Sequence, residues 1–100
     1  MFLHLRKMNK EKRLKQFHKI PSIGKAYSLD LWNIGIKSIE QLSGQNPNFL
    51  YEKLNTLTGV RHDICMLYTF RCSNYHATEQ NHDELKLNWW YWKNKTYNEN

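Results

Sequence analysis

Side chains that bind zinc in proteins gather in one stretch of this sequence. His62, Cys65, Cys72 and His76 have the right types, and neighbours spaced three or four positions apart lie close together on a helix. The whole set, however, spans about 20 Å along one helix at 1.5 Å per residue, whereas zinc needs every ligand at about 2.0–2.3 Å. We therefore expect no metal and no other cofactor, with a half-site completed by His82 or a second chain left open.

The two cysteines also argue against a disulfide. Cys65 and Cys72 would lie about 10.5 Å apart on a helix, beyond the roughly 7 Å limit for a disulfide. Buried thiols suit a reducing compartment, so a cytoplasmic location is expected. The apolar residues at positions 1–5 are too few for a signal-peptide core. No run of about 20 apolar residues is present to span a membrane.

Catalysis has little support in the sequence. No nucleophile with a base and an orienting partner is recognisable by spacing, and no glycine-rich nucleotide loop is present. Asp30 is best explained as a residue of a helix surface and Asp63 as a helix cap. We expect a protein that binds rather than an enzyme.

A short turn is the most informative chemical feature. The segment Ile20–Gly24, followed by Lys25, joins two predicted helices. Such a turn leaves backbone N–H groups without intrahelical partners, and these can bind an anion. Gly24 allows a phosphate to approach closely, Lys25 adds a cation, and Ile23 would anchor the turn in the core. The alternative is a plain connection that serves packing.

The charge supports an anionic partner. The net charge is +6, and residues 1–25 hold eight cations and one anion. Residues 26–80 carry four cations and five anions, and residues 81–100 are balanced. An excess confined to the first quarter is typical of a polyanion-binding surface, with nucleic acid the commonest candidate, although a solvated helix would look the same. Arg13, Lys15 and Lys19 are the cations just before the turn.

Helical spacing of apolar residues, together with capping signals, predicts an all-α fold of about five short helices, without strands. A chain of 100 residues suits one small core. We divide it into a basic arm or helix extension (1–13), a helical domain (14–94) and a polar tail (95–100). The first helix is expected to end before Pro21, and the second to run over Lys25–Ile34 with Gly35 as its cap. Three further helices are expected from Ser38 through Leu42, from Asn46–Pro47 to Gly59, and from Asp63 to about Ala77.

The last predicted helix should be the central one. Its apolar stripe consists of Ile64, Leu67, Tyr68, Cys72 and Tyr75, and Met66 and Phe70 lie off this stripe. It should therefore be covered on more than one face.

Other features have two possible explanations. Trp89, Trp90 and Trp92 with Tyr91 could stack on unpaired bases, but packing against the core is favoured, with at least one tryptophan exposed. Arg61 and Arg71 are expected at the solvated surface.

The segment 17–36 resembles a helix-hairpin-helix motif, with Ser22 where the motif has its first glycine. At positive φ a serine would be strained by about 1 kcal/mol, so Ser22 either tolerates this or adopts another turn. Its hydroxyl could contact a phosphate or a neighbouring backbone group. A weaker second hairpin, Leu42–Pro47, has no cation and is interpreted as structural.

The resemblance extends over residues 14–94, through the runs IPSIGKAYSLDLWNIGIKSIEQL, LYEKLNTLTGVRHDICMLYTFRC and LKLNWWYWKN. These are similar to a small bacterial family of pathogenicity-locus or mitomycin-resistance helix-hairpin-helix proteins. The first part also resembles the C-terminal domain of TfoX-type competence regulators. The resemblance implies a role on DNA, with a link to DNA damage or repair, through the hairpin residues Ile20, Pro21, Ser22, Ile23, Gly24 and Lys25.

Backbone amides and lysines contact phosphates rather than base edges. We therefore predict DNA binding with little sequence preference through the hairpin and Arg13, Lys15 and Lys19, without a membrane partner. The alternative is an accessory module that binds a protein of a DNA-processing or regulatory complex.

Overall fold

Helices account for all the regular structure in the described part of the chain. The computed structural model describes the backbone of residues 2–93 and the side chains of residues 10–93, so the predicted tail (95–100) lies outside it. The predicted all-α class is confirmed there. The elements are α1 (Phe2–Phe17), α2 (Lys25–Asn33), α3 (Ile39–Leu42), α4 (Pro47–Thr58), α5 (Ile64–Thr78) and the 3-10 helices η1 (Glu84–Leu87) and η2 (Trp89–Trp92).

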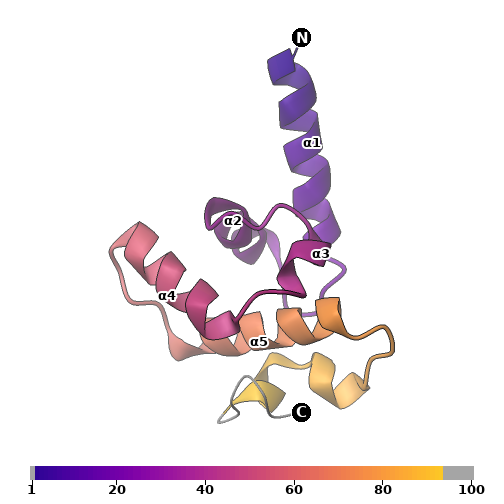
Figure 1. Cartoon of the computed structure of the whole chain (residues 1–100), viewed down its shortest axis with the longest axis vertical. Coiled ribbons are helices and arrows are strands. Elements are labelled where there is room, and N and C mark those ends of the chain that lie inside the picture. The colour runs from indigo at the N-terminus through magenta and orange to yellow at the C-terminus, as the bar shows by residue number, and fades with distance from the viewer. Residues whose placement is uncertain (1, 94–100) are drawn as a thin grey trace.

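Helix α5 is central, as predicted. It begins at the Asp63 cap, whose carboxylate accepts a hydrogen bond from the Cys65 N–H at 2.8 Å. Helices α3 and α4 contact it from one side and η1 and η2 from the other (Figure 1). Phe70 is fully buried, whereas Ile64, expected in the buried stripe, is exposed in the first turn. The helix is thus covered on two faces.

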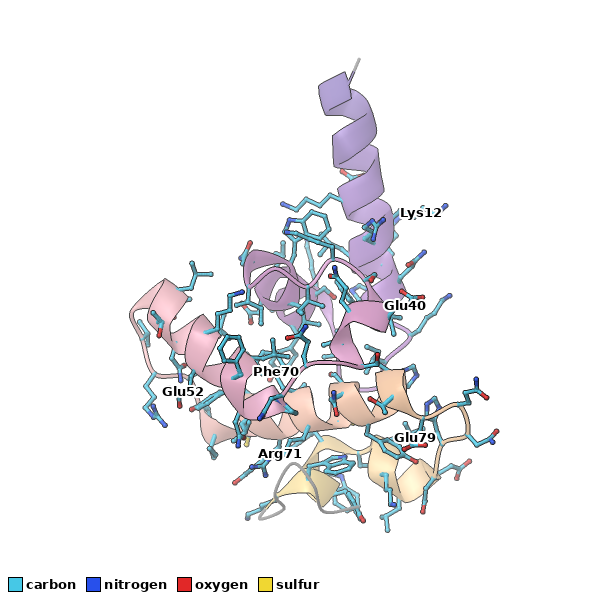
Figure 2. All side chains as sticks on the ribbon, viewed as in Figure 1. Lys12, Glu40, Glu52, Phe70, Arg71 and Glu79 are labelled. Carbon is cyan, nitrogen blue, oxygen red and sulfur yellow. The ribbon has the colours of Figure 1, made fainter. Side chains whose placement is uncertain are left out.

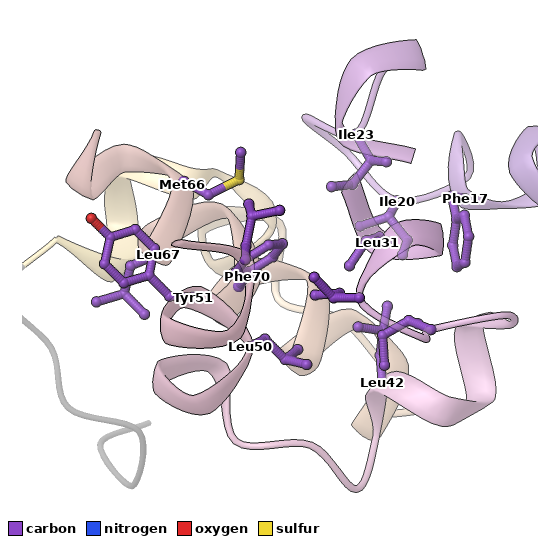
Figure 3. Close-up of a cluster of buried hydrophobic side chains, with 13 residues drawn as sticks. Phe17, Ile20, Ile23, Leu31, Leu42, Leu50, Tyr51, Met66, Leu67 and Phe70 are labelled. Carbon is purple, nitrogen blue, oxygen red and sulfur yellow. The ribbon is translucent and has the colours of Figure 1, made fainter. Parts of the chain in front are cut away.

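The main core joins the α1–α2 region to α3, α4 and α5 (Figure 3). Phe17 and Phe70 are its largest fully buried side chains. Ile20 and Ile23 bring the turn between α1 and α2 into the same cluster. This packing makes the turn part of the folded body. In contrast, the N-terminal part of α1 projects beyond it (Figure 1).

Helix α2 ends with backbone hydrogen bonds around Gly35. The Gly35 N–H donates to the Trp32 carbonyl at 3.1 Å, and the Ile36 N–H donates to the Leu31 carbonyl at 2.9 Å. Gly35 has φ +98°, a conformation that favours glycine. Burial of both Leu31 and Ile36 completes a Schellman cap, and the predicted helix stop at Gly35 is confirmed.

The two caps predicted for α3 and α4 differ in outcome. Ser38 precedes α3, but its side chain makes no capping hydrogen bond, and the Lys37 N–H instead donates to the Gln41 side chain. Asn46 does cap α4, accepting from the Asn48 N–H at 2.9 Å. Leu57 falls on the same apolar face of α4 as the buried Leu50 and Leu54 by helical spacing, but it is 58% exposed. The reason is that α4 diverges from α5 toward its C-terminal end (Figure 1).

The C-terminal aromatic segment packs against α5, and its tryptophans differ in exposure. Trp92 is buried, donates from Nε1 to the Lys86 carbonyl at 2.9 Å, and contacts the Tyr75 ring at 5.6 Å between centroids. Trp90 is 52% exposed, so the prediction that one tryptophan faces solvent is confirmed. Arg71 is not a solvated surface residue, because its Nη1 donates to the Trp92 carbonyl at 3.0 Å (Figure 2).

Candidate nucleic-acid interface

The turn between α1 and α2 is anchored from inside. The Ile20 N–H donates to the Phe17 carbonyl at 3.0 Å, and the Ile23 N–H donates to the Ile20 carbonyl at 3.1 Å. The two isoleucine side chains are only 1% and 5% exposed, so Ile23 anchors the turn as predicted. These two residues shape the turn without offering side chains to a ligand. Pro21, like the remaining predicted hairpin residues, is exposed.

Ser22 occupies the strained conformation. Its φ is +75°, and no other non-glycine residue in the described chain has a positive φ. Of the two possibilities for this position, the structure therefore shows toleration of the strain, at about 1 kcal/mol. The Ser22 hydroxyl makes no hydrogen bond with any described residue, so it does not satisfy a neighbouring backbone group.

Helix α2 opens with a row of unbonded backbone donors. Its first hydrogen bond runs from the Ser28 N–H to the Gly24 carbonyl at 3.0 Å, and the Ser28 hydroxyl donates to the same oxygen at 2.8 Å. The N–H groups of Gly24, Lys25, Ala26 and Tyr27 accordingly have no acceptor among the described residues. No side chain caps this end and no acidic residue occupies the first turn. The positive end of the helix dipole is left for an external anion.

Gly24 leaves open space beside these donors. A Cβ built at this position would meet no atom within 4 Å, and its φ of −102° is open to any residue. The fold itself therefore does not require glycine here. A side chain would occupy the space through which an anion approaches the amides, which is the constraint that favours glycine.

A groove between α1 and α2 brings two predicted cations together. The pocket has a volume of about 260 Å³, and the residues that line it are Glu11, Leu14, Lys15, His18, Lys25, Ser28 and Leu29. The α1 members recur at helical spacing, a signal in the sequence that predicts one shared face. Lys15 and Lys25 thus border one groove at the start of α2. Lys19 is exposed in the turn beside it.

Arg13 lies apart from that groove. Its Nη1 donates to the Lys37 carbonyl at 3.0 Å, and with Lys12, Ser38 and Glu40 it lines a hollow between α1 and α3. Figure 2 labels Lys12 on α1 and Glu40 on α3. The structure therefore brings Lys15 and Lys25 together but directs Arg13 to another face. The sequence alone had assigned Arg13, Lys15 and Lys25 to one binding site.

The lysines around the turn carry no intramolecular ion pair. Among the described side chains, the one ion pair joins Arg61 and Glu52 at 3.6 Å on the exposed outer side of α4. The surface position predicted for Arg61 is thereby confirmed. No carboxylate among the described side chains lies within the same distance of Lys15, Lys19 or Lys25, which leaves their charges available to a polyanion.

The second turn, residues 42–47, is tied to α5. The Asn74 side-chain amide donates to the Leu42 carbonyl at 2.7 Å and to the Gln45 carbonyl at 2.9 Å. Leu42 and Pro47 are both buried. These contacts give the turn a packing role, and its own residues provide no cation.

The zinc-type residues are dispersed. No three His, Cys, Asp or Glu side chains in the described part of the chain lie close enough to hold a metal ion. His76 stacks on His82 with ring centroids 4.4 Å apart, and burial with this neighbour lowers the pKa of His76. Both cysteines are free, but only Cys72 is fully buried, and burial raises the pKa of its thiol to about 12.

His62, in the loop before α5, is hydrogen-bonded to α4 and influences Asp30 of α2 electrostatically. The His62 Nδ1 lies 2.8 Å from the Asn55 Oδ1, and the backbone N–H of His62 donates to the same oxygen. Burial raises the pKa of Asp30, while the charge of His62 partly opposes this shift. Asp30 is therefore half-buried between elements and not a plain surface residue as predicted.

Taken together, these features define a small all-helical protein with an exposed row of unbonded amides at its most basic edge. None of its described helices has the length and hydrophobicity needed to cross a bilayer. The family model described as pathogenicity locus, Cdd1, matches residues 10–98. The chain belongs to this family. No curated protein and no solved structure matches it.

Proposed function

We propose that this protein binds DNA through the phosphate backbone, with α1, the turn and α2 acting as a helix-hairpin-helix unit. The observation that carries the proposal is the row of amides at Gly24, Lys25, Ala26 and Tyr27, which find no acceptor within the described residues. Such a row binds a phosphate oxygen, and the neighbouring lysines add attraction to the adjacent phosphates.

The same chemistry supports binding with little sequence preference. Amides and lysines contact phosphate oxygens, which are the same at every base pair. The likeness of the hairpin region to TfoX-type regulators agrees with a role on DNA, and the likeness to mitomycin-resistance proteins supports a link to DNA damage or repair. The two free cysteines suit the reducing cytoplasm. We assign the protein a binding role and no catalytic one.

Glycine-to-glutamate substitutions test the proposal. Gly24→Glu places a carboxylate beside the unbonded amides, and the open space there lets the fold accept it. Gly44→Glu is the matched control, because its Cβ also meets nothing within 4 Å and the charge change is identical. We expect Gly24→Glu to weaken duplex binding about tenfold or more, the loss of one charge-assisted contact, and Gly44→Glu to change it little.

Fluorescence anisotropy with a labelled duplex at low salt measures both affinities, and circular dichroism checks that helicity is kept. Equal affinities for the native protein and Gly24→Glu would refute the hairpin as the phosphate-binding element. Equal weakening by both variants would show that only net charge matters.

A second candidate function, docking onto a protein, is favoured by the outer side of α4. Phe49, Leu57 and Val60 are large apolar side chains exposed there, and a shallow groove runs past Phe49 and Leu57. Phe49→Ser with Leu57→Ser should leave DNA binding intact. Retention of one stoichiometric partner by the native chain, lost in this double variant, would support docking as the main function.

A further inference from the structure

A second pocket opens on another side of the hairpin. It has a volume of about 280 Å³ and is lined by Ser22 of the turn, Tyr27 of α2, Cys65 and Thr69 of α5, and Trp89 of η2. Four separate segments of the chain therefore meet around it. None of the cations that border the α1–α2 groove lines this pocket.

Three polar side chains of this pocket have no hydrogen-bond partner in the described part of the chain. The hydroxyls of Ser22 and Tyr27 and the indole N–H of Trp89 make no hydrogen bond with any described residue. The Thr69 hydroxyl donates to the Cys65 carbonyl at 2.9 Å, which leaves its oxygen as an acceptor. The pocket thus combines donors and acceptors with two aromatic rings. A flat ring system with hydrogen-bonding edges matches this chemistry.

The three tryptophans of the C-terminal segment have different surroundings. Trp92 is buried against Tyr75, and Trp90 is exposed without lining the pocket. Trp89 alone contributes to the pocket wall. Packing of the core explains Trp92, but it does not explain why Trp89 stands at an open pocket beside the turn.

We propose that this pocket receives one unpaired nucleobase from the DNA strand whose phosphate lies on the hairpin. The inference rests on the proposed function, because Tyr27 both offers an unbonded backbone N–H to the phosphate site and lines the pocket. The volume lies near the lower limit of about 300–1,000 Å³ for small-molecule sites, which suits a ligand of base size. The preferred substrate is then DNA with an unpaired base.

The energetic reason for this preference is the cost of removing a base from the duplex. A paired base must be unstacked and unpaired before it can enter a pocket, whereas an extrahelical base has already paid most of that penalty. Stacking on one aromatic side chain corresponds to about 5- to 150-fold in affinity per base. A bulged duplex should therefore bind about fivefold or more tightly than a paired one.

Three labelled duplexes of equal length test the inference by anisotropy. One is fully paired, one carries a single extrahelical nucleotide, and one carries an abasic residue at that same position. We expect the native protein to favour the bulged duplex and to bind the abasic duplex like the paired one, because the base itself is recognised. Trp89→Ala should abolish the preference while keeping affinity for paired DNA, and the neighbouring Trp90→Ala should keep both.

Alkylation of Cys65 provides a second readout on the native chain, since its side chain lines the pocket. The bulged duplex should slow alkylation of Cys65, and the paired duplex should not. Protection by a free deoxynucleoside monophosphate at the same concentration would overturn the DNA assignment. Equal binding of the bulged and abasic duplexes would also overturn it, even if Trp89→Ala failed to fold.

Different results would overturn the phosphate-binding function and the pocket inference. If the paired duplex binds and the native protein shows no preference for the bulge, the pocket inference is wrong and the phosphate-binding function stands. If no duplex binds at low salt, both are wrong.

Discussion

Replacement of Lys25 by alanine should reduce the salt dependence of DNA binding by about one phosphate contact. Lys25 begins α2 and is exposed, and Lys15 and Lys19 are exposed beside the same turn. None of these three lysines forms an ion pair with a described side chain. Each lysine that neutralises a phosphate adds about −0.9 to the slope of log affinity against log salt. The three together give a slope of about −2.7.

The size of the effect follows from this slope. Between 50 and 200 mM salt, a slope of about −2.7 corresponds to a loss of affinity of about 40-fold. Without Lys25 the slope becomes about −1.8 and the loss about 12-fold. The fold should be unaffected, because a cation at a helix N-terminus opposes the helix dipole and its removal costs no stability.

Anisotropy titrations of one duplex at four salt concentrations measure the two slopes. Lys53→Ala is the control, since Lys53 is exposed on α4, its Nζ lies near Gly35 at the C-terminal end of α2, and it does not line the hairpin groove. Its slope should equal that of the native protein. The reasoning would be refuted by an unchanged slope in Lys25→Ala, or by an equal decrease in Lys53→Ala.

Four further predictions concern stability and reactivity. Phe70→Ala removes a fully buried ring and should lower the free energy of unfolding by about 3–5 kcal/mol in urea titrations; a loss below about 1 kcal/mol would contradict its central position. Ser22→Gly relieves the positive φ and should raise the unfolding free energy by up to about 1 kcal/mol. A decrease would mean that the Ser22 hydroxyl holds the turn. Because burial raises the pKa of Cys72 to about 12, mass spectrometry should find Cys65 alkylated first and Cys72 only after unfolding. Equal rates would show that Cys72 is accessible. Burial and His82 lower the pKa of His76, so the unfolded state binds that proton more readily. Stability should then fall as pH drops below about 6.5, the ordinary histidine value, with a smaller fall in Tm for His76→Phe; an identical fall would exclude His76 as the cause.

Local signals in the sequence predicted the helices and the turn well. Asn46, Asp63 and Gly35 end or begin helices as expected, because a cap depends on hydrogen bonds to residues only two to five positions away. The turn between α1 and α2 was recognisable for the same reason. The prediction that Ile23 anchors this turn in the core is confirmed by its burial.

Burial at the ends of helices was predicted less well. Leu57 and Ile64 fit apolar stripes in the sequence, yet both are exposed, since α4 diverges from α5 and the first turn of α5 is uncovered there. Periodicity tells which side of a helix is apolar. It does not tell how far a neighbouring helix extends along that side.

What the sequence by itself determined is the all-helical class, the basic N-terminal quarter and the hairpin with its unbonded amides, all of which depend on neighbours along the chain. Only the tertiary structure decided that Arg13 leaves the hairpin groove, that Arg71 bonds to the Trp92 carbonyl, and that Trp89 reaches the pocket beside Ser22. These contacts join residues separated by more than twenty positions, and the packing of whole helices against one another, rather than local spacing, brings such residues together.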